Sequence, residues 1–249
     1  TVDAWLIYRL TRGVSFRTDV SNASRTQLLD LDSLDWSPEM LGLFGIERWM
    51  LPEVCESNSL FGYSDLDGLL PEPVPICGVL GDSQAALLGN GCLDRGGAKL
   101  TLGTGTSVMV NAGSARPRLS GGVVESVGWK LNGRLCYVAE GNINYTGALI
   151  VWLKDRLCLI ENSRDVGPIA AGLEDNGGVY LVPAFTGLGA PHWRGDVRAA
   201  ILGLGIGSGR EHIIRAAEEA VAYQIADVYG ELTSSCGPIP LIFADGGAK

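Results

Sequence analysis

The sequence predicts a mixed α/β protein. Three observations indicate this class: helical patterns dominate the first part of the chain, strand hairpins fill the middle, and helices and strands alternate in the last part. The change from helix to strand falls at the glycine-containing segment Gly89-Asn90-Gly91. Because such segments mark turns and linkers, we expect a domain boundary there.

The first part of the chain predicts helices and one buried strand. Two segments fit helices, residues 3–11 and, after a Ser37 cap, residues 38–44. Residues 75–80 form a continuous apolar run that ends at Gly81, as expected of a buried strand. Asp82 is then predicted to cap a helix that runs through Leu88.

The pattern changes to strands after Gly91. The expected strands are residues 99–102, 107–111, 123–131 and 134–139. Asn132-Gly133 separates the last two, and this is the residue pair that a type I′ turn prefers. The middle of the chain is therefore predicted to form antiparallel hairpins.

The last part of the chain predicts alternating helices and strands. Helices are expected at residues 145–159, 166–173 and 211–232, and strands at residues 179–185 and 241–244. In the first of these helices, Leu149, Trp152, Leu153 and Leu157 lie on one broad face. We expect this face to pack against a core.

Composition argues against several functional classes. Of the 249 residues, 46% are hydrophobic and 19% charged, which is ordinary for a folded enzyme. A net charge of -9 without a Lys/Arg cluster argues against a nucleic-acid partner, and no apolar run is long enough for a membrane span. The six cysteines form no CxxC pair, so we expect reduced thiols in a cytoplasmic protein.

The two ends of the sequence predict an internal piece of a longer protein. The chain begins at Thr1 inside a helical pattern. It stops at Lys249, directly after an apolar strand. A natural chain rarely ends on the loop that should begin its next helix, so we expect further residues on both sides. These 249 residues alone are therefore expected to lack the activity of the whole protein.

Two short segments carry the chemistry that the sequence indicates. Gly81-Asp82 places a carboxylate between a strand and a helix, where it can accept a proton from a hydroxyl. Gly103-Thr104-Gly105-Thr106 is a turn of small residues whose backbone amides can face phosphate. Together they favour phosphoryl transfer from a nucleotide to a hydroxyl. An ordinary helix cap and an ordinary β-turn would use the same residue types.

Other catalytic motifs receive less support. The sequence has no Gly-Lys dipeptide for a P-loop, no GxGxxG after a strand, and only two histidines. Gly81-Asp82-Ser83-Gln84-Ala85 is similar to the GxSxG elbow of hydrolases, with Ser83 as nucleophile and His212 downstream. However, the fifth position is Ala, and His212 is expected to cap the long helix. A hydrolase is the minor alternative.

Short segments spread over the whole chain form one ordered series. They are residues 3–7, 18–26, 34–36, 50–54, 81–87, 103–105, 140–141, 152–155, 182–191, 212–216, 222–224 and 245–248. In this order, and with few changes of length, the chain resembles the FGGY family of carbohydrate kinases and, within it, the glycerol kinases. Residues 182–191 come close to a signature by themselves.

The resemblance implies a two-domain α/β fold of the actin-like ATPase (ribonuclease H-like) type. The chain would span the end of the N-terminal domain, residues 1–91, which binds substrate. It would also span much of the ATP-binding C-terminal domain, residues 92–249. The implied reaction uses ATP and Mg²⁺ to phosphorylate a primary hydroxyl of a polyol. Glycerol is the first candidate for this polyol. A kinase for another sugar or polyol of xylulose, ribulose or erythritol type is the alternative, as is a catalytically idle nucleotide-binding relative. Homo-oligomerisation stays open.

The resemblance also implies roles for single residues. Asp82 would be the general base, would bind the substrate and would face Mg²⁺ through water. The turn Gly103-Thr104-Gly105 would contact the phosphates of ATP. Gly147 and Val151 would line the nucleotide pocket, and Gly246-Gly247 would lie near the adenosine and the α-phosphate.

Three positions depart from the pattern of glycerol kinases. Ser83 stands directly after the base, where Gln is usual, and Ser107 stands where an aromatic residue is frequent. Val151 replaces a Gln of the nucleotide pocket. By the resemblance, Ser83 and Ser107 are substrate-binding positions. These two small hydroxyls would admit a larger polyol or sugar, or they reflect drift among glycerol kinases.

Overall fold

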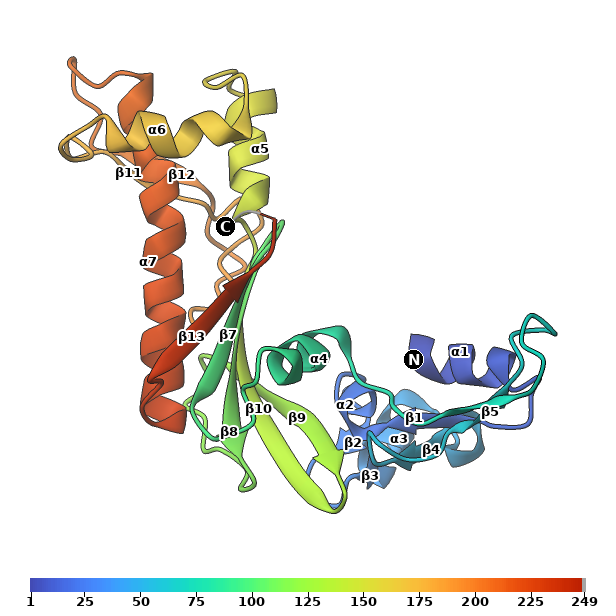
Figure 1. Cartoon of the computed structure of the whole chain (residues 1–249). Helices are drawn as coiled ribbons and strands as arrows, with labels where there is room; N and C mark the ends of the chain where they lie inside the picture. Colours follow the sequence, from blue (N-terminus) through green and yellow to red (C-terminus); the bar gives the residue numbers. More distant parts are fainter. Residues whose placement is uncertain (248–249) are drawn as a thin grey trace. The chain divides into compact units, whose positions relative to one another are not determined.

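The computed structural model describes residues 1–247, which form a mixed α/β protein that divides into two compact units (Figure 1). The first unit consists of Thr1–Arg95, Asn111–Pro117 and Glu125–Val138. The second consists of Gly96–Val110, Arg118–Val124 and the residues from Ala139 onward. Ala248, which ends one of the segments of the resemblance, lies outside the described residues. The assignment of residues 1–91 and 92–249 to two functional domains stays a prediction.

The first unit is built from short elements. Its helices before Gly81 are α1 (Val2–Leu10), α2 (Val20–Ala23), α3 (Pro38–Phe44) and a 3₁₀ turn at Arg48–Met50. Its strand pairs are β1 (Arg17–Asp19) with β4 (Glu53–Cys55), β2 (Leu29–Asp30) with β3 (Asp35–Trp36), and β5 (Gly62–Ser64) with β6 (Val74–Ile76). The Ser37 hydroxyl accepts the N–H of Met40, so the predicted cap of α3 is confirmed.

Two predictions around Gly81 are wrong. The apolar run at residues 75–80 is not a buried strand, because β6 ends at Ile76 and no residue of the run is buried. Pro75 has no N–H to donate to a strand ladder, which limits pairing here. Asp82 does not cap α4 (Asp82–Gly89) but is its first residue, because Gly81 takes the extended conformation of the N-cap.

A five-stranded sheet follows α4, in the order β13-β7-β8-β10-β9. Its strands are β7 (Gly97–Leu102), β8 (Thr106–Gly113), β9 (Val124–Leu131), β10 (Arg134–Ile143) and β13 (Leu241–Asp245). β7 and β8 are antiparallel, with Leu102 opposite Thr106, whereas β13 is parallel to β7. Asn132 and Gly133 both have positive φ, as the predicted turn between β9 and β10 requires. Every strand predicted for the middle of the chain is therefore present.

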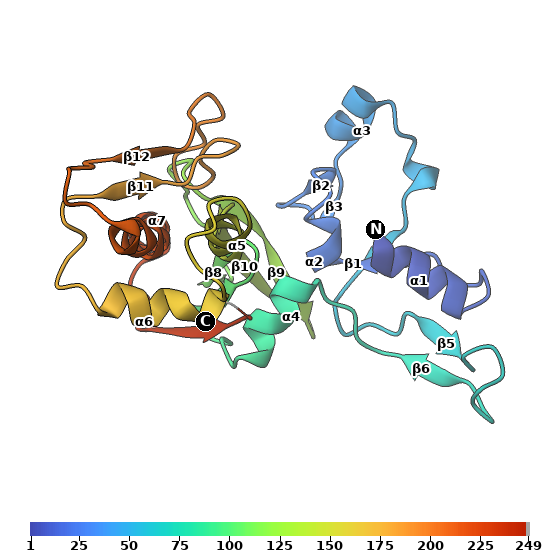
Figure 2. The ribbon, with the colours of Figure 1, turned by 90° about the horizontal axis from the view of Figure 1, so that it is seen from above.

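The helices α5 (Gly147–Asp155), α6 (Val166–Ala171) and α7 (Arg210–Cys236) belong to the second unit. Figure 2 looks along α7 and shows α6 on one side of it and the antiparallel pair β11 (Tyr180–Val182) and β12 (Ala200–Leu202) on the other. Leu149 and Leu153 of α5 are fully buried in a core that includes Ile214 of α7. Leu157 is exposed, because α5 ends before it.

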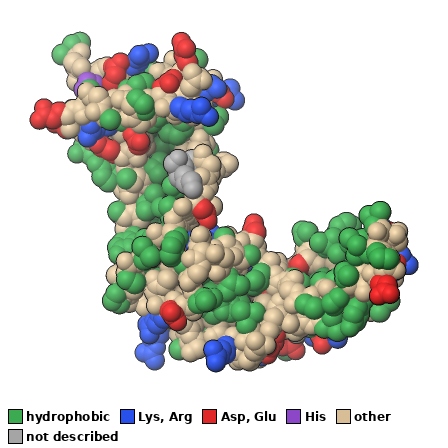
Figure 3. All heavy atoms as spheres, in the orientation of Figure 1, with side chains coloured by type: hydrophobic (Ala, Val, Ile, Leu, Met, Phe, Trp, Pro, Cys, Tyr) green, Lys and Arg blue, Asp and Glu red, His purple; other side chains and the backbone are tan. Residues whose placement is uncertain are grey.

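Hydrophobic side chains also lie at the surface of the first unit, over α1 and β5 (Figure 3). Trp5 and Leu6 of α1 and Tyr63 of β5 are among the exposed ones. Within residues 1–247, no helix has the length and apolar character needed to cross a membrane.

Candidate active site

The turn Gly103-Thr104-Gly105 joins β7 to β8 and is held by the start of α5. The N–H groups of Thr146 and Ala148 donate to the Thr104 carbonyl at 3.1 and 3.0 Å, and the N–H of Gly147 donates to the Gly103 carbonyl at 3.0 Å. These N–H groups at a helix start have no partner within their own helix. The turn supplies that partner, so its backbone is fixed to the end of α5.

The amides of the turn itself remain available. Among the described residues, the N–H groups of Thr104 and Gly105 donate to no protein acceptor. Successive free N–H groups in a turn form a concave site for an anion. The arrangement therefore fits phosphate at the turn rather than at the N-terminus of α5, whose first N–H groups are already used.

Glycine is required at two points where backbones meet closely. A Cβ on Gly147 would lie 2.6 Å from the Gly103 carbonyl oxygen, and a Cβ on Gly105 would lie 2.4 Å from the Ile143 carbonyl oxygen. Both distances are shorter than real Cβ contacts allow. Any other residue would push the turn away from α5 at Gly147 and away from the end of β10 at Gly105.

A pocket of about 670 Å³ opens beside this turn. Its lining residues are Gly103, Thr104, Gly147, Ala148, Ile150, Val151, Ser163, Arg164 and Gly247. The volume falls within the range of about 300–1,000 Å³ that is typical of small-molecule sites. The structure therefore brings together several residues predicted for the nucleotide, although they come from β7–β8, α5 and the end of the chain.

Gly105 and Gly246 were also predicted for the nucleotide but do not line the pocket. Gly105 closes the turn, and its carbonyl accepts the N–H of Gly103 at 2.9 Å. Gly246 has a φ of +103° and lies directly against Leu102 at the end of β7, where a Cβ would come within 2.2 Å of the carbonyl oxygen. Both residues shape the backbone next to the pocket.

Sequence reasoning missed Arg164. It lies in the 3₁₀ turn Ser163–Asp165 and is the charged residue among those described as lining the pocket. A guanidinium group can pair with phosphate or stack on an aromatic ring. No local motif distinguishes Arg164, because only the packing of the turn near α5 brings it to the pocket.

Asp82 lies in the first unit, at the first position of α4, and its side chain is exposed. Its Oδ1 accepts the N–H of Ser83 at 2.7 Å. The carboxylate is therefore accessible from solvent. Ser83, the next residue, is half-buried.

Ser107 lies on β8 in the second unit, next to the turn. Its hydroxyl donates to Oε1 of Glu140 at 2.7 Å, and Glu140 is buried on the neighbouring strand β10. Because the Ser107 proton is used in this bond, the Ser107 oxygen can accept a hydrogen bond from a bound group. The half-buried Ser107 is therefore a candidate acceptor for a substrate hydroxyl.

His212 has the capping role that the sequence predicts. Its Nδ1 accepts the N–H of Gly209 at 3.0 Å at the start of α7, and its ring packs against Gly177. A ring nitrogen held in this way is not available to activate a serine. This observation disfavours the hydrolase alternative.

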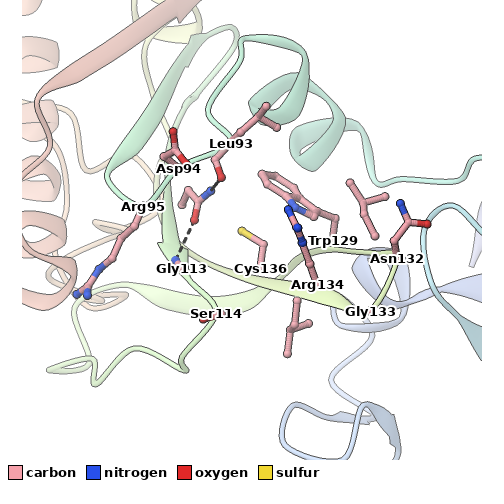
Figure 4. A pocket seen from close by; sticks show the side chains of 13 residues that line it. Leu93, Asp94, Arg95, Gly113, Ser114, Trp129, Asn132, Gly133, Arg134 and Cys136 are labelled. Carbon is pink, nitrogen blue, oxygen red and sulfur yellow. Dashed lines mark hydrogen bonds between the residues drawn. The ribbon is translucent and has the colours of Figure 1, made fainter.

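A second pocket, of about 1160 Å³, lies in the first unit (Figure 4). Figure 4 shows the Trp129 ring and the Cys136 thiol close together in this pocket, whereas the Arg95 side chain points away from them. None of the residues predicted for catalysis or for nucleotide binding lines it. Asp82 of the first unit and the pocket beside Gly103-Thr104-Gly105 of the second unit are therefore taken as two separate candidate functional positions.

Comparison with known families gives two matches that together cover most of the chain. Residues 1–89 match the N-terminal domain of the FGGY family of carbohydrate kinases. Residues 98–249 match the C-terminal domain of the same family.

Individual relatives agree with these matches. The chain is 51% identical to glycerol kinase 1 of Thermotoga maritima and 45% identical to a glycerol kinase of Desulfitobacterium hafniense. The alignments cover 99% and 100% of this chain, respectively, but 50% of each relative. Among solved structures, that of Plasmodium falciparum glycerol kinase with ADP matches with a TM-score of 0.91 and 36% identity. This match covers 99% of the chain and 50% of that protein.

Proposed function

The chain belongs to the FGGY family of carbohydrate kinases, and from this premise we propose that the protein transfers the γ-phosphoryl group of ATP to a primary hydroxyl of a polyol. The preferred acceptor is glycerol, which would give glycerol 3-phosphate. The family and the α/β fold predicted from the sequence are confirmed. The chain spans about half the length of the relatives it matches, so the activity of the whole protein is part of the proposal.

The observation that carries the proposal is the pocket beside the Gly103-Thr104-Gly105 turn. Its lining includes Gly147, Val151 and Gly247, which the resemblance assigns to the nucleotide. The glycines let backbone atoms lie close together, and the amides of Thr104 and Gly105 have no partner among the described residues. These features support binding of a nucleotide with its phosphates toward the turn.

In the proposed reaction, Asp82 accepts the proton of the acceptor hydroxyl as its oxygen attacks the γ-phosphorus. A carboxylate exposed at the start of a helix is accessible to an acceptor hydroxyl, as a general base must be. The amides of the turn would stabilise the charge on the phosphates. Carboxylate oxygen is also a donor that Mg²⁺ prefers, so Asp82 fits the predicted contact through water. Mg²⁺ bound with ATP would neutralise phosphate charge.

The choice of acceptor in the proposal depends on Ser83 and Ser107. Ser83 and Ser107 place small hydroxyls at positions that the resemblance assigns to the substrate, and Ser107 is oriented by Glu140. Small side chains leave space for an acceptor longer than glycerol. This observation favours a second candidate, a kinase for a polyol or ketose of erythritol, ribulose or xylulose type. In either case we place the reaction in the cytoplasm, where thiols stay reduced.

The test is ADP release by the natural full-length protein with a panel of acceptors, namely glycerol, erythritol, ribulose and xylulose. We expect ATP-dependent turnover with the highest kcat/KM for glycerol. A higher kcat/KM for one of the longer acceptors would replace glycerol and retain the kinase reaction. Absence of acceptor-dependent ADP release with every compound would overturn the proposal.

A further inference from the structure

Asp19 is a fully buried carboxylate that the proposed reaction does not use. Its oxygens accept hydrogen bonds from the N–H and hydroxyl of Ser21, the N–H and side-chain amide of Asn22, and the hydroxyl of Ser57. The two backbone bonds are those of an ordinary N-cap, here of α2. The bonds from two buried hydroxyl groups go beyond what capping requires.

Ser21 connects this carboxylate to the start of α4. Its hydroxyl donates to Oδ1 of Asp19 at 2.9 Å, and its oxygen accepts the N–H of Gly81 at 2.9 Å. Ser21 has no exposed surface, and all of these residues belong to the first unit. Both views of the ribbon show α2 beside the start of α4 (Figures 1 and 2).

Gly81 is confined on a second side by Gln84. A Cβ on Gly81 would lie 2.5 Å from Oε1 of Gln84, which is itself buried, and 3.7 Å from the Ser21 hydroxyl oxygen. The φ of Gly81 is -61°, which any residue adopts. A side chain at position 81 would require the Gln84 side chain to move, and the bond from the Gly81 N–H to the Ser21 hydroxyl holds the residue before Asp82 in place.

We propose that Ser21, oriented by Asp19, is a positioning residue for Asp82. The inference rests on the proposed function, in which Asp82 is the general base. The Ser21 hydroxyl fixes the N–H of Gly81 and with it the first turn of α4, from which the Asp82 carboxylate reaches solvent. A general base acts only within hydrogen-bond reach of the proton that it takes, so a small displacement lowers the rate. ATP binding depends on other residues and does not change.

The test compares Ser21→Ala with wild type in the natural full-length protein. Removal of the hydroxyl leaves the Gly81 N–H without its acceptor. We expect kcat to fall by about tenfold to a hundredfold, the range that misplacement of a catalytic group produces, with the KM for ATP unchanged. Ser21→Thr retains the hydroxyl and is expected to restore most of kcat. Both parameters are measured on protein shown to be folded by its thermal transition.

Ser57→Ala is the matched control. The Ser57 hydroxyl is equally buried and donates to the other oxygen of Asp19 at 2.7 Å, but it makes no bond to Gly81. We expect Ser57→Ala to lower the melting temperature about as much as Ser21→Ala while kcat stays near the wild-type value. Equal loss of kcat in both variants, or normal kcat in Ser21→Ala, would overturn the proposal.

Ser21→Cys covers the case in which Ser21→Ala does not fold. Sulfur fills the position of the hydroxyl but is a weak hydrogen-bond acceptor, so kcat should fall with little loss of stability. The proposal fails if Ser21→Cys has wild-type kcat. Wild-type protein without turnover on any acceptor would defeat the proposed function and this inference together. An active wild type with an equally active Ser21 variant would defeat this inference alone.

Discussion

Gly147 joins the candidate nucleotide pocket to the turn Gly103-Thr104-Gly105. Its N–H donates to the Gly103 carbonyl, and its missing side chain lets α5 lie directly on the turn. At this residue, the hydrogen bonding of the helix start and the shape of the pocket depend on the same atoms. A change here should therefore affect binding of nucleotide before it affects the rest of the fold.

We expect Gly147→Ala to weaken nucleotide binding by about tenfold or more. The added methyl group would lie 2.6 Å from the Gly103 carbonyl oxygen and displace the turn, and overpacking of this kind costs about 1–3 kcal/mol. Calorimetric titration of the natural full-length protein with ADP measures the effect. An unchanged Kd for ADP would show that the turn and α5 do not form the nucleotide site.

Gly81 explains why the predicted N-cap role of Asp82 was wrong. An Asp between Gly and a helix is usually the N-cap, and the sequence therefore predicts this role for Asp82. In the structure, the bond from the Gly81 N–H to Ser21 fixes Gly81 as the N-cap and moves Asp82 into the helix. The partner lies 60 residues away in the sequence, so no local pattern contains this information.

Among the elements, α7 is the longest helix that the structure describes, and it contains a glycine, Gly230, in its interior. A Cβ on Gly230 would meet no atom within 4 Å. The residue is exposed and its backbone is helical. Gly230→Ala is thus an unhindered counterpart of Gly147→Ala in the same unit.

We expect Gly230→Ala to stabilise the protein by about 0.5–1 kcal/mol and to leave the Kd for ADP unchanged. Alanine is the better helix former because it loses less backbone freedom on folding. Denaturant unfolding followed by circular dichroism measures the change. A loss of stability would mean that Gly230 makes a contact that the described structure does not show.

The elements also show how far a sequence pattern predicts structure. β7, β8, β9 and β10 are close to prediction, because glycine-containing turns separate them and fix their ends. The pairs β1–β4, β2–β3 and β5–β6 were not predicted. Their strands have only two or three residues, too few for a pattern of alternation, and pairing between distant segments defines them.

At the scale of the whole molecule, the candidate site could be predicted in part. The segments around Asp82 and Gly103-Thr104-Gly105, together with a resemblance that runs along the entire chain, predict most of the residues of the candidate site. The contribution of Arg164 and the bond from Ser107 to Glu140 could not be predicted. Both depend on tertiary packing between segments that are far apart in the sequence.

Burial across the molecule also predicts which thiols react. Cys136 is buried and Cys158 exposed. Burial raises the pKa of the Cys136 thiol to about 12. Because the thiolate is the reactive form, Cys136 should resist iodoacetamide at pH 8 while Cys158 is alkylated. Peptide mapping by mass spectrometry after a timed reaction measures both residues. Rapid alkylation of Cys136 in folded protein would contradict this expectation.

The same raised pKa gives a pH dependence of stability. The unfolded chain releases the Cys136 proton near pH 9, whereas the folded protein retains it until about pH 12. The stability from this group is fully present below pH 9 and is lost as the pH rises toward 12. Unfolding measured across this range should show a decline that a Cys136→Ala variant reduces.

The assignment of Asp82 as the general base is tested by comparing Asp82→Asn with wild type in the natural full-length protein, by acceptor-dependent ADP release and by calorimetric binding of ATP. Asparagine has nearly the same shape but cannot accept the hydroxyl proton. General-base catalysis contributes about 10²–10⁴-fold, so we expect a loss of kcat of that size with the Kd for ATP unchanged. Wild-type turnover by Asp82→Asn would contradict the assignment of Asp82 as the base and, with it, the proposed mechanism.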